Sequence, residues 1–271
     1  MLQFKSALWS NVANYDLSVV PLFIFMGFLA AEAGLSRDLF AGFSALFGKI
    51  RGGVAMAAIG ACAGFGAVSG SSIATASTMS KVSLPELRKL KYDDGLATGA
   101  LAAGGTLGIL IPPSVALVIY AIVVEGSIIE MFQAAVLPGL LAVVFFIFVI
   151  WLRVHLNPEL APKAKVLSKK ERNEALWRLV PVLLIFGTII MGLGIGLFTP
   201  TPAAAMGVLV ILLYGFISRF FSQTYLTVQK IRNSILSTAK TAGMIYFILF
   251  AADGLKGFFA RSGLPVALTD L

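Results

Sequence analysis

Residues 53–80 decide the fold, and they read GVAMAAIGACAGFGAVSGSSIATASTMS. The stretch is apolar and rich in small residues, and Ser69-Gly70-Ser71-Ser72 lies in its middle. Charged segments flank it on both sides, at 35–51 and at 81–93. A helix that spans a membrane needs about 20 residues, so fewer than about 30 residues are too few for two full spans. Whether this stretch crosses once or turns back therefore depends on where its charged flanks lie.

The composition of the chain argues against a water-soluble domain. Of its 271 residues, 58% are hydrophobic and 13% are charged, and the mean hydropathy is +0.93. Soluble domains have roughly 45–50% apolar and about 25% charged residues, so this chain has more apolar surface than such a fold can hide. The apolar residues form long blocks without the alternation of a membrane β-strand. We therefore predict an all-α polytopic membrane protein.

The basic residues indicate which segments share one side of the membrane. Four segments, 35–51, 81–91, 153–178 and 219–240, hold 18 of the 21 Lys and Arg residues. Cytoplasmic loops of membrane proteins are enriched in these residues, which explains the net charge of +8 better than nucleic-acid binding does, because no basic stripe is interleaved with exposed aromatics. Both flanks of 53–80 are then cytoplasmic. The stretch is predicted to be a re-entrant hairpin.

Apolar blocks and their breaks predict the other elements. The first portion, residues 1–152, is expected to hold a membrane helix at 17–34, an interfacial amphipathic helix at 35–51, the hairpin at 53–80, a broken helix at 94–124 and a helix at 131–152. A basic cytoplasmic loop at 153–178 follows. Residues 179–271, with spans at 179–198, 203–217 and 241–252 and a polar linker at 219–240, are interpreted as the start of a second repeat.

A short internal match supports the repeat. FIFMGFLAAEAGL at 23–35 and IYFILFAADGL at 245–255 are both apolar helices that end in Ala-Ala-acid. The charge pattern gives them opposite directions across the membrane, as in an inverted repeat. A complete second repeat would need another hairpin and another broken helix after Leu271, so we expect the chain to be incomplete.

The hairpin tip and the broken helix share one kind of chemistry. Hydroxyls and a glycine lie at residues 68–72, and the segment 104–113, GGTLGILIPP, contains three glycines and two prolines. Prolines remove backbone donors and glycines loosen the helix, so carbonyl oxygens are freed at membrane depth. Secondary transporters bind Na⁺ at such breaks. The alternative is that the glycines only allow close helix packing and the prolines only kink the helix.

Other kinds of site find no support in the sequence. Cys62 and His155 are the only residues of their types, so neither an intrachain disulfide nor a His/Cys metal site can form. Asp93 and Asp94 are adjacent in a charged segment, which does not suit an intramembrane protease. No GxxxxGK[ST] phosphate loop occurs. We therefore expect neither an enzyme nor a cofactor, whereas a passive channel remains an alternative.

Several motifs in the chain occur together in one known family. They are FGAVSGSSIATASTM at 65–79, LPELRKLKYDDGLATGALAAGGTLGILIPPS at 84–114, IYAIVVEGSI at 119–128, VLPGLL at 136–141, VPLFIFMG at 20–27 and LFTPTPAAA at 197–205. Together, with the pieces SGS, GGTLGILIPPS and PGLL in that order along the chain, they resemble the large permease subunit, DctM-like, of tripartite ATP-independent periplasmic (TRAP) transporters. The chain departs from that family in having Pro202 where a glutamate is usual. It also lacks the family's further N-terminal helices and its second hairpin, so it resembles the middle of the permease and is expected to be incomplete at both ends.

The resemblance implies an elevator-type fold and a sodium-driven importer in the cytoplasmic (inner) membrane of a bacterium or archaeon. A periplasmic substrate-binding protein would deliver an organic acid such as a dicarboxylate, and a small DctQ-like membrane subunit would brace the permease in the lipid bilayer. No nucleic-acid partner is expected. Another sodium-coupled elevator-type anion transporter, or a passive channel, is the alternative.

The resemblance also assigns roles to individual residues. Na⁺ as the coupling ion would be coordinated by hydroxyls of Ser69, Ser71 and Thr106, because a hard cation prefers oxygen ligands. Backbone carbonyls would complete the site, from Gly70, Gly104, Gly108 and Pro112. Candidates for lining the substrate cavity are Ser72, Pro113 and Ser114.

Overall fold

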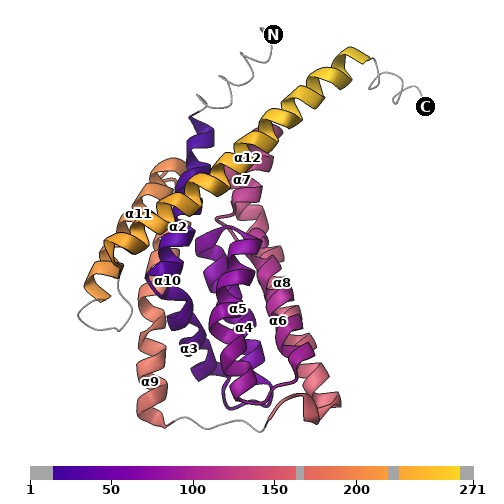
Figure 1. Ribbon diagram of the computed structural model, residues 1–271, viewed down its shortest axis with the longest axis vertical. Helices are drawn as coiled ribbons and strands as arrows, with labels where there is room; N and C mark the ends of the chain where they lie inside the picture. Colours follow the sequence, from indigo (N-terminus) through magenta and orange to yellow (C-terminus); the bar gives the residue numbers. More distant parts are fainter. Residues whose placement is uncertain (1–14, 163–167, 219–225, 263–271) are drawn as a thin grey trace.

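The computed structural model describes residues 15–162, 168–218 and 226–262, and all regular secondary structure in these ranges is helical (Figure 1). The α-helices are α2 (Val19–Glu32), α3 (Leu35–Phe47), α4 (Gly53–Ser69), α5 (Ser72–Lys89), α6 (Asp94–Leu110), α7 (Val115–Val123), α8 (Ile128–Leu156), α9 (Lys169–Trp177), α10 (Leu179–Gly194), α11 (Pro200–Ile217) and α12 (Val228–Ser262). Within these described ranges, four helices are long and apolar enough to cross a membrane, or up to six if two bent pairs each count as one span. The predicted class, an all-α polytopic membrane protein, is confirmed.

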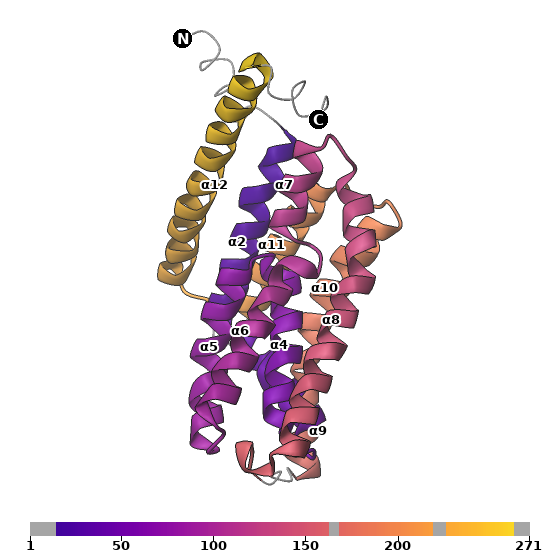
Figure 2. The same ribbon diagram turned by 90° about the vertical axis from the view of Figure 1, so that its right-hand side faces the viewer.

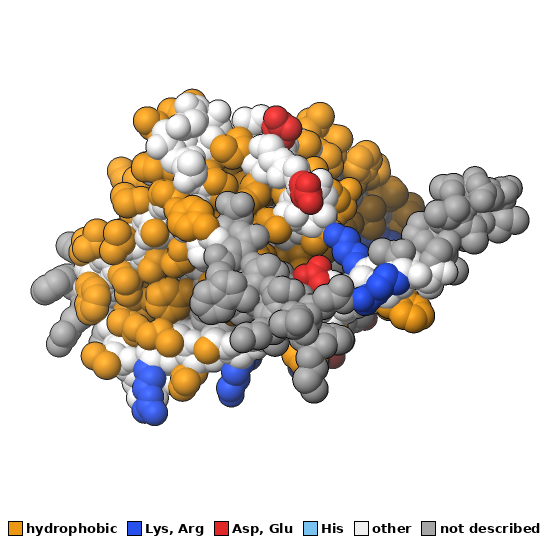
Figure 3. All heavy atoms as spheres, turned by 90° about the horizontal axis from the view of Figure 1, so that it is seen from above, with side chains coloured by type: hydrophobic (Ala, Val, Ile, Leu, Met, Phe, Trp, Pro, Cys, Tyr) orange, Lys and Arg blue, Asp and Glu red, His pale blue; other side chains and the backbone are white. Residues whose placement is uncertain are grey.

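The outer surface explains the high hydropathy of the chain. Viewed from above, apolar side chains cover much of the molecule (Figure 3). On α8, Leu137, Val144 and Phe145 are each at least 60% exposed. So much exposed apolar surface is unusual for a soluble monomer, whereas lipid tails are its natural surroundings. The helical surface therefore suits a bilayer.

Most of the helices run along the long axis of the molecule, and several of their connections lie at its lower end (Figures 1 and 2). Three loops are joined at the lower end. Arg51 Nε donates to the carbonyl of Ala161 (3.0 Å), and the amide of Asp93 donates to the carbonyl of Leu160 (3.0 Å). The phenol of Tyr92 accepts from the amide of Val54 (3.3 Å). Because burial raises the pKa of Tyr92, the phenol stays neutral in this contact.

The second arm of the hairpin is longer than the sequence suggested. The predicted hairpin ended at residue 80 and a charged loop followed, but α5 continues to Lys89. Thr75, Met79, Ser83 and Leu87 are buried at four-residue intervals, which is the spacing of one helix face. This buried face holds the charged segment in a helix.

Two other segments that were predicted to be a loop and a linker also contain helix. The predicted basic loop at 153–178 contains α9, whose first turn is fixed by a capping box between Ser168 and Glu171. The predicted linker before residue 241 contains the first part of α12, which begins at Val228. Residues 163–167 and 219–225 of these two segments lie outside the described residues.

Small residues let the hairpin and α6 pack closely. A methyl group on Gly66 of α4 would lie 2.7 Å from the Cα of Gly108 on α6. A methyl group on Gly105 would lie 2.6 Å from the Cβ of Ala76 on α5. Close approach through small residues is how helices associate in membranes. α4, α5 and α6 therefore form one tightly packed unit, with α2 against the hairpin tip.

Two helix pairs are bent. α2 and α3 meet at 66°, where Gly34 has φ +88°. α3 is the predicted amphipathic helix, and its apolar residues Leu35, Leu39 and Phe40 are buried. α6 and α7 meet at 41°, which is the break predicted between the two halves of 94–124.

Candidate functional site

The hairpin tip is made by two residues between α4 and α5. Gly70 ends α4 with φ +61°, a left-handed conformation that glycine adopts at little cost. Ser71 is extended and caps α5, because its hydroxyl accepts from the amide of Ala74 (3.4 Å). The tip thus consists of a glycine turn followed by a helix start.

The break between α6 and α7 is made by Pro112 and Pro113. Proline has no amide hydrogen, so the carbonyls of Gly108 and Ile109 cannot receive the usual helical bond from these positions. Ser114 then starts α7, and its buried hydroxyl accepts from the amide of Leu117 (3.5 Å). The break leaves carbonyl oxygens at the end of α6 and amides at the start of α7.

The tip and the break lie against each other. The amide of Val115 donates to the carbonyl of Gly70 (3.1 Å). A methyl group on Gly70 would lie 2.9 Å from the carbonyl oxygen of Pro113, and one on Gly108 would lie 2.6 Å from that of Ser71. The two interruptions therefore form a single structure.

A buried pair of hydroxyls lies directly below the tip. Ser69 Oγ and Thr75 Oγ1 are 2.8 Å apart, and the two residues are at most 1% exposed. Sequence reasoning identified Ser69 but missed Thr75. A usable signal was its spacing, because Thr75 follows the cap residue Ser71 by four positions and thus lies on the same helix face.

The helix ends around the tip carry complementary partial charges. The carboxyl ends of α4 and α6 are negative, and the amino ends of α5 and α7 are positive. A cavity of about 190 Å³ adjoins them. It is lined by Ile24, Gly27, Phe28, Ser69, Gly70, Ser71, Ser72, Ile73, Ala74, Ile109, Val115, Ala116, Ile119, Thr241 and Ile245. These residues are apolar or carry hydroxyls, so the cavity suits a small ligand that the helix ends orient.

Not every predicted site residue reaches this cavity. Ser72 lines it, whereas Pro113 and Ser114 are buried and are not among its lining residues. Gly104 lies lower on α6 and packs against the sulfur of Cys62. Thr106 is exposed, and its hydroxyl donates to the carbonyl of Ala103 (2.7 Å) in its own helix. The structure thus brings together the tip residues and Gly108, but not the Thr106 hydroxyl.

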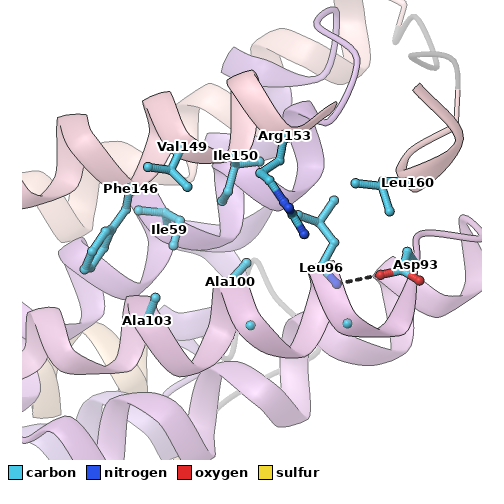
Figure 4. A pocket seen from close by; sticks show the side chains of 12 residues that line it. Ile59, Asp93, Leu96, Ala100, Ala103, Phe146, Val149, Ile150, Arg153 and Leu160 are labelled. Atoms are coloured by element: carbon cyan, nitrogen blue, oxygen red, sulfur yellow. Dashed lines mark hydrogen bonds between the residues drawn. The ribbon is translucent and has the colours of Figure 1, made fainter. Parts of the chain in front are cut away.

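A separate cavity of about 380 Å³ lies between α4, α6 and α8 (Figure 4). Its walls are mainly apolar, and Arg153 of α8 lies at one end near Leu96 (Figure 4). Asp93 is held at the start of α6, where its carboxylate accepts from the amide of Leu96 (2.8 Å). None of the residues predicted to bind sodium or substrate lines this cavity. In the described part of the chain, no group of three or more His, Cys, Asp or Glu could hold a metal ion.

Comparison with known proteins gives a consistent family. Residues 2–271 match the family model for "Tripartite ATP-independent periplasmic transporter, DctM component". The chain is 30% identical to the C4-dicarboxylate TRAP transporter large permease protein DctM of Rhodobacter capsulatus, over 97% of this chain and 62% of that protein. It is 32% identical to the sialic acid TRAP transporter large permease protein SiaM of Vibrio cholerae, over 96% and 60%.

A third relative is the isethionate TRAP transporter permease protein DctMQ of Oleidesulfovibrio alaskensis. It is 27% identical over 97% of this chain and 40% of its own length. The chain therefore spans between 40% and 62% of the length of these three relatives.

Proposed function

The chain belongs to the DctM component family of tripartite ATP-independent periplasmic transporters, and on this premise we propose that it forms part of a sodium-coupled importer of an organic anion. The family consists of transporter permeases. Three relatives are named for C4-dicarboxylate, sialic acid and isethionate, which are all organic anions. C4-dicarboxylates and sialic acid carry carboxylates and isethionate carries a sulfonate, so the proposed cargo is an organic acid, with a carboxylate as the first class to test.

The hydrogen bond between Val115 and Gly70 is the observation that carries the proposal. It joins the hairpin tip to the break in the neighbouring helix, so oxygens of both can surround one ion. The proposed sodium ligands are those predicted from the sequence. The geometry supports Ser69, Gly70, Ser71 and Gly108 among them, whereas Thr106 points elsewhere in this conformation.

The proposed substrate position is the cavity beside the tip. The amino ends of α5 and α7 point into the same region, and such ends favour anions. Sodium at the carboxyl ends and an anion at the amino ends would each stabilise the other, because their charges are opposite. This is a physical basis for coupling the two.

The mechanism and partners we propose follow the family. The packed unit of α4, α5 and α6 would move against the rest as an elevator. A small DctQ-like subunit would brace the permease in the inner membrane of a bacterium or archaeon, and a periplasmic binding protein would supply the substrate. The lower end of the molecule would face the cytoplasm.

Uptake into proteoliposomes tests the proposal. The intact permease, its small subunit and the binding protein are reconstituted, and accumulation of succinate, sialic acid or isethionate is measured with and without an inward sodium gradient. We expect uptake of one of these anions that needs both sodium and the binding protein. Uptake that needs neither would identify a passive channel and overturn the proposal.

A further inference from the structure

The cavity between α4, α6 and α8 is a groove that opens on the outer surface of the molecule. On α6 it is lined by small residues, which are Gly95, Gly99, Ala100 and Ala103. On α8 it is lined by larger apolar residues, which are Phe146, Val149 and Ile150. Gly99 is exposed, and nothing lies within 4 Å of the position that a methyl group would take there. The hollow of about 380 Å³ therefore has protein walls and an open mouth.

The mouth of this α6–α8 groove faces lipid. Phe148 and Val149 on α8 are about half exposed, and Val144 and Phe145 are each at least 60% exposed. A helix surface of this kind suits hydrocarbon rather than water. An apolar hollow that stays empty loses dispersion contacts along its walls, and water gains no hydrogen bonds in it. An acyl chain is the group in a membrane that fills such a groove.

The groove has the length of one leaflet. Trp151 of α8 stacks on His155, with ring centroids 5.4 Å apart, and tryptophan is enriched where hydrocarbon meets the head groups. Arg153 lies in the same turn of α8, so it is at that level. Figure 4 shows Arg153 and Asp93 at one end of the groove and Ala103 toward the other. From Asp93 to Ala103 the helix rises about 15 Å, which is half of a hydrocarbon core of about 30 Å.

Opposite charges line the end of the groove near Trp151. The Arg153 side chain points from α8 toward α6 (Figure 4), and within the described ranges its guanidinium has no hydrogen-bond or ion-pair partner. One carboxylate oxygen of Asp93 accepts from the amide of Leu96 at the start of α6 (2.8 Å). The other oxygen makes no hydrogen bond in the part of the chain that the structure describes. A cation and an anion thus face the same end of the groove without pairing with each other.

This arrangement of charge is complementary to a zwitterionic head group. A guanidinium binds a phosphate through two parallel N–H donors, and a carboxylate accepts from a primary ammonium. Phosphatidylethanolamine carries both groups close together, next to its acyl chains. An anionic phospholipid would leave Asp93 opposed to a negative charge, and a free phosphate would leave the apolar walls uncovered.

We propose that the α6–α8 groove binds phosphatidylethanolamine. One acyl chain lies between α6 and α8, the phosphate accepts from Arg153, and the ammonium donates to the free oxygen of Asp93. The bound lipid joins the start of α6 to the end of α8. This site uses neither the proposed sodium ligands nor the cavity beside the hairpin tip, so it goes beyond the proposed transport function.

Native mass spectrometry of the protein in detergent tests the head group. Phosphatidylethanolamine, phosphatidylcholine and phosphatidylglycerol with the same acyl chains are added in equal amounts, and the bound lipids are counted. Phosphatidylcholine has no N–H donor for Asp93, and phosphatidylglycerol has a net negative charge. We expect phosphatidylethanolamine to bind about two- to fivefold more tightly than either, which is the contribution of one partly exposed ion pair.

Two substitutions separate the two parts of the head group. Arg153→Gln removes the partner of the phosphate and should weaken binding of all three lipids about two- to fivefold. Asp93→Asn keeps a residue that can cap α6 but removes its charge, so phosphatidylethanolamine should lose its advantage over phosphatidylcholine. Lys89→Gln, which removes a charge on α5 outside the groove, should alter neither result.

Gly99→Leu tests the position of the acyl chain. A leucine has room there, because nothing lies within 4 Å of its first side-chain carbon, and its remaining carbons would fill the groove. It should reduce binding of all three lipids, whereas the unfolding temperature without added lipid should stay the same or rise. Ala102→Leu, at an exposed position of α6 outside the groove, should leave lipid binding unchanged.

Three results would overturn the inference. The first is equal binding of the three lipids, or binding that Arg153→Gln leaves unchanged. The second is tighter binding of phosphatidylglycerol, because the groove would then select negative charge. The third is a lower unfolding temperature with Gly99→Leu, which would show that protein fills the groove. Transport is measured in none of these experiments, so their outcome is independent of sodium-coupled uptake.

Discussion

Ser69 is the residue at which sodium binding can be tested most directly. Its hydroxyl is buried at the end of α4 and lies 2.8 Å from Thr75 Oγ1. A ligand to a charged group contributes about 1.5–3 kcal/mol, so Ser69→Ala should raise the sodium concentration for half-maximal uptake roughly ten- to a hundredfold. Uptake is measured in proteoliposomes at varied sodium concentration.

A matched control for this substitution is Ser83→Ala. Ser83 is also buried on the hairpin, and its hydroxyl has no hydrogen-bond partner among the described residues. Its loss should leave the sodium dependence unchanged. If Ser69→Ala and Ser83→Ala behave alike, the oxygens at the tip are packing features and the sodium site lies elsewhere.

Substitution of Gly70 tests how much the stability of the protein depends on the close approach of the hairpin tip to the α6–α7 break. Alanine at φ +61° costs about 1–2 kcal/mol, and its methyl group would lie 2.9 Å from the Pro113 carbonyl oxygen. Gly196 has φ +75° with open space around it, so Gly196→Ala isolates the backbone cost. We expect Gly70→Ala to lower the unfolding temperature in detergent further than Gly196→Ala. Equal shifts would show that the tip and the break are not in contact.

At the scale of elements, the contact between α6 and the hairpin depends on Gly108. A methyl group there would lie 2.5 Å from Thr75 Oγ1 and 2.6 Å from the Ser71 carbonyl oxygen. Overpacking of this kind typically costs 1–3 kcal/mol. Gly108→Ala should therefore destabilise the protein and reduce uptake, since it displaces α5 from α6.

Gly99 provides the control on the same helix. Nothing lies within 4 Å of a methyl group at Gly99, and alanine is favoured over glycine inside a helix by roughly 0.5–1 kcal/mol. Gly99→Ala should raise the unfolding temperature slightly and leave uptake intact. A Gly108→Ala protein as stable and active as the Gly99→Ala protein would contradict the packing described here.

The same elements show what the sequence could and could not predict. The tip and the break were predictable because Gly70, Pro112 and Pro113 act through their own backbone chemistry. The end of α5 was not predictable from the sequence. The charged residues after position 80 indicate a loop, although Leu87 among them belongs to a buried helix face. The spacing of Thr75 from Ser71 indicates which face of α5 it occupies, but its contact with Ser69 was not predictable, since that depends on how α4 and α5 face each other.

The direction of the Thr106 side chain illustrates the same limit within one helix. The motif placed Thr106 among the hydroxyl ligands. In the structure, however, Gly104, Gly105 and Gly108 are on the side of α6 that packs against the hairpin. With 3.6 residues per turn, position 106 then falls on another face. A motif gives the residues of a site, whereas the rotation of the helix decides which of them converge.

At the scale of the whole molecule, the arrangement of the ends supports the orientation predicted from charge. The joined loops around Arg51, Tyr92 and Leu160 lie at the lower end, together with the basic helix α9 (Figure 1). The turn between α10 and α11 lies at the upper end (Figure 2). Because basic segments remain in the cytoplasm, we expect the lower end to be cytoplasmic.

Labelling from one side checks this orientation. In a Cys62→Ser background, Asn173→Cys on α9 and Gly194→Cys at the end of α10 place exposed thiols at opposite ends of α10. An impermeant maleimide added to intact spheroplasts should label Gly194→Cys and should label Asn173→Cys only after lysis. The reverse pattern would invert the molecule, so that its lower end would face the periplasm. Because the basic segments at that end would then lie outside the cytoplasm, this result would overturn the orientation predicted from charge.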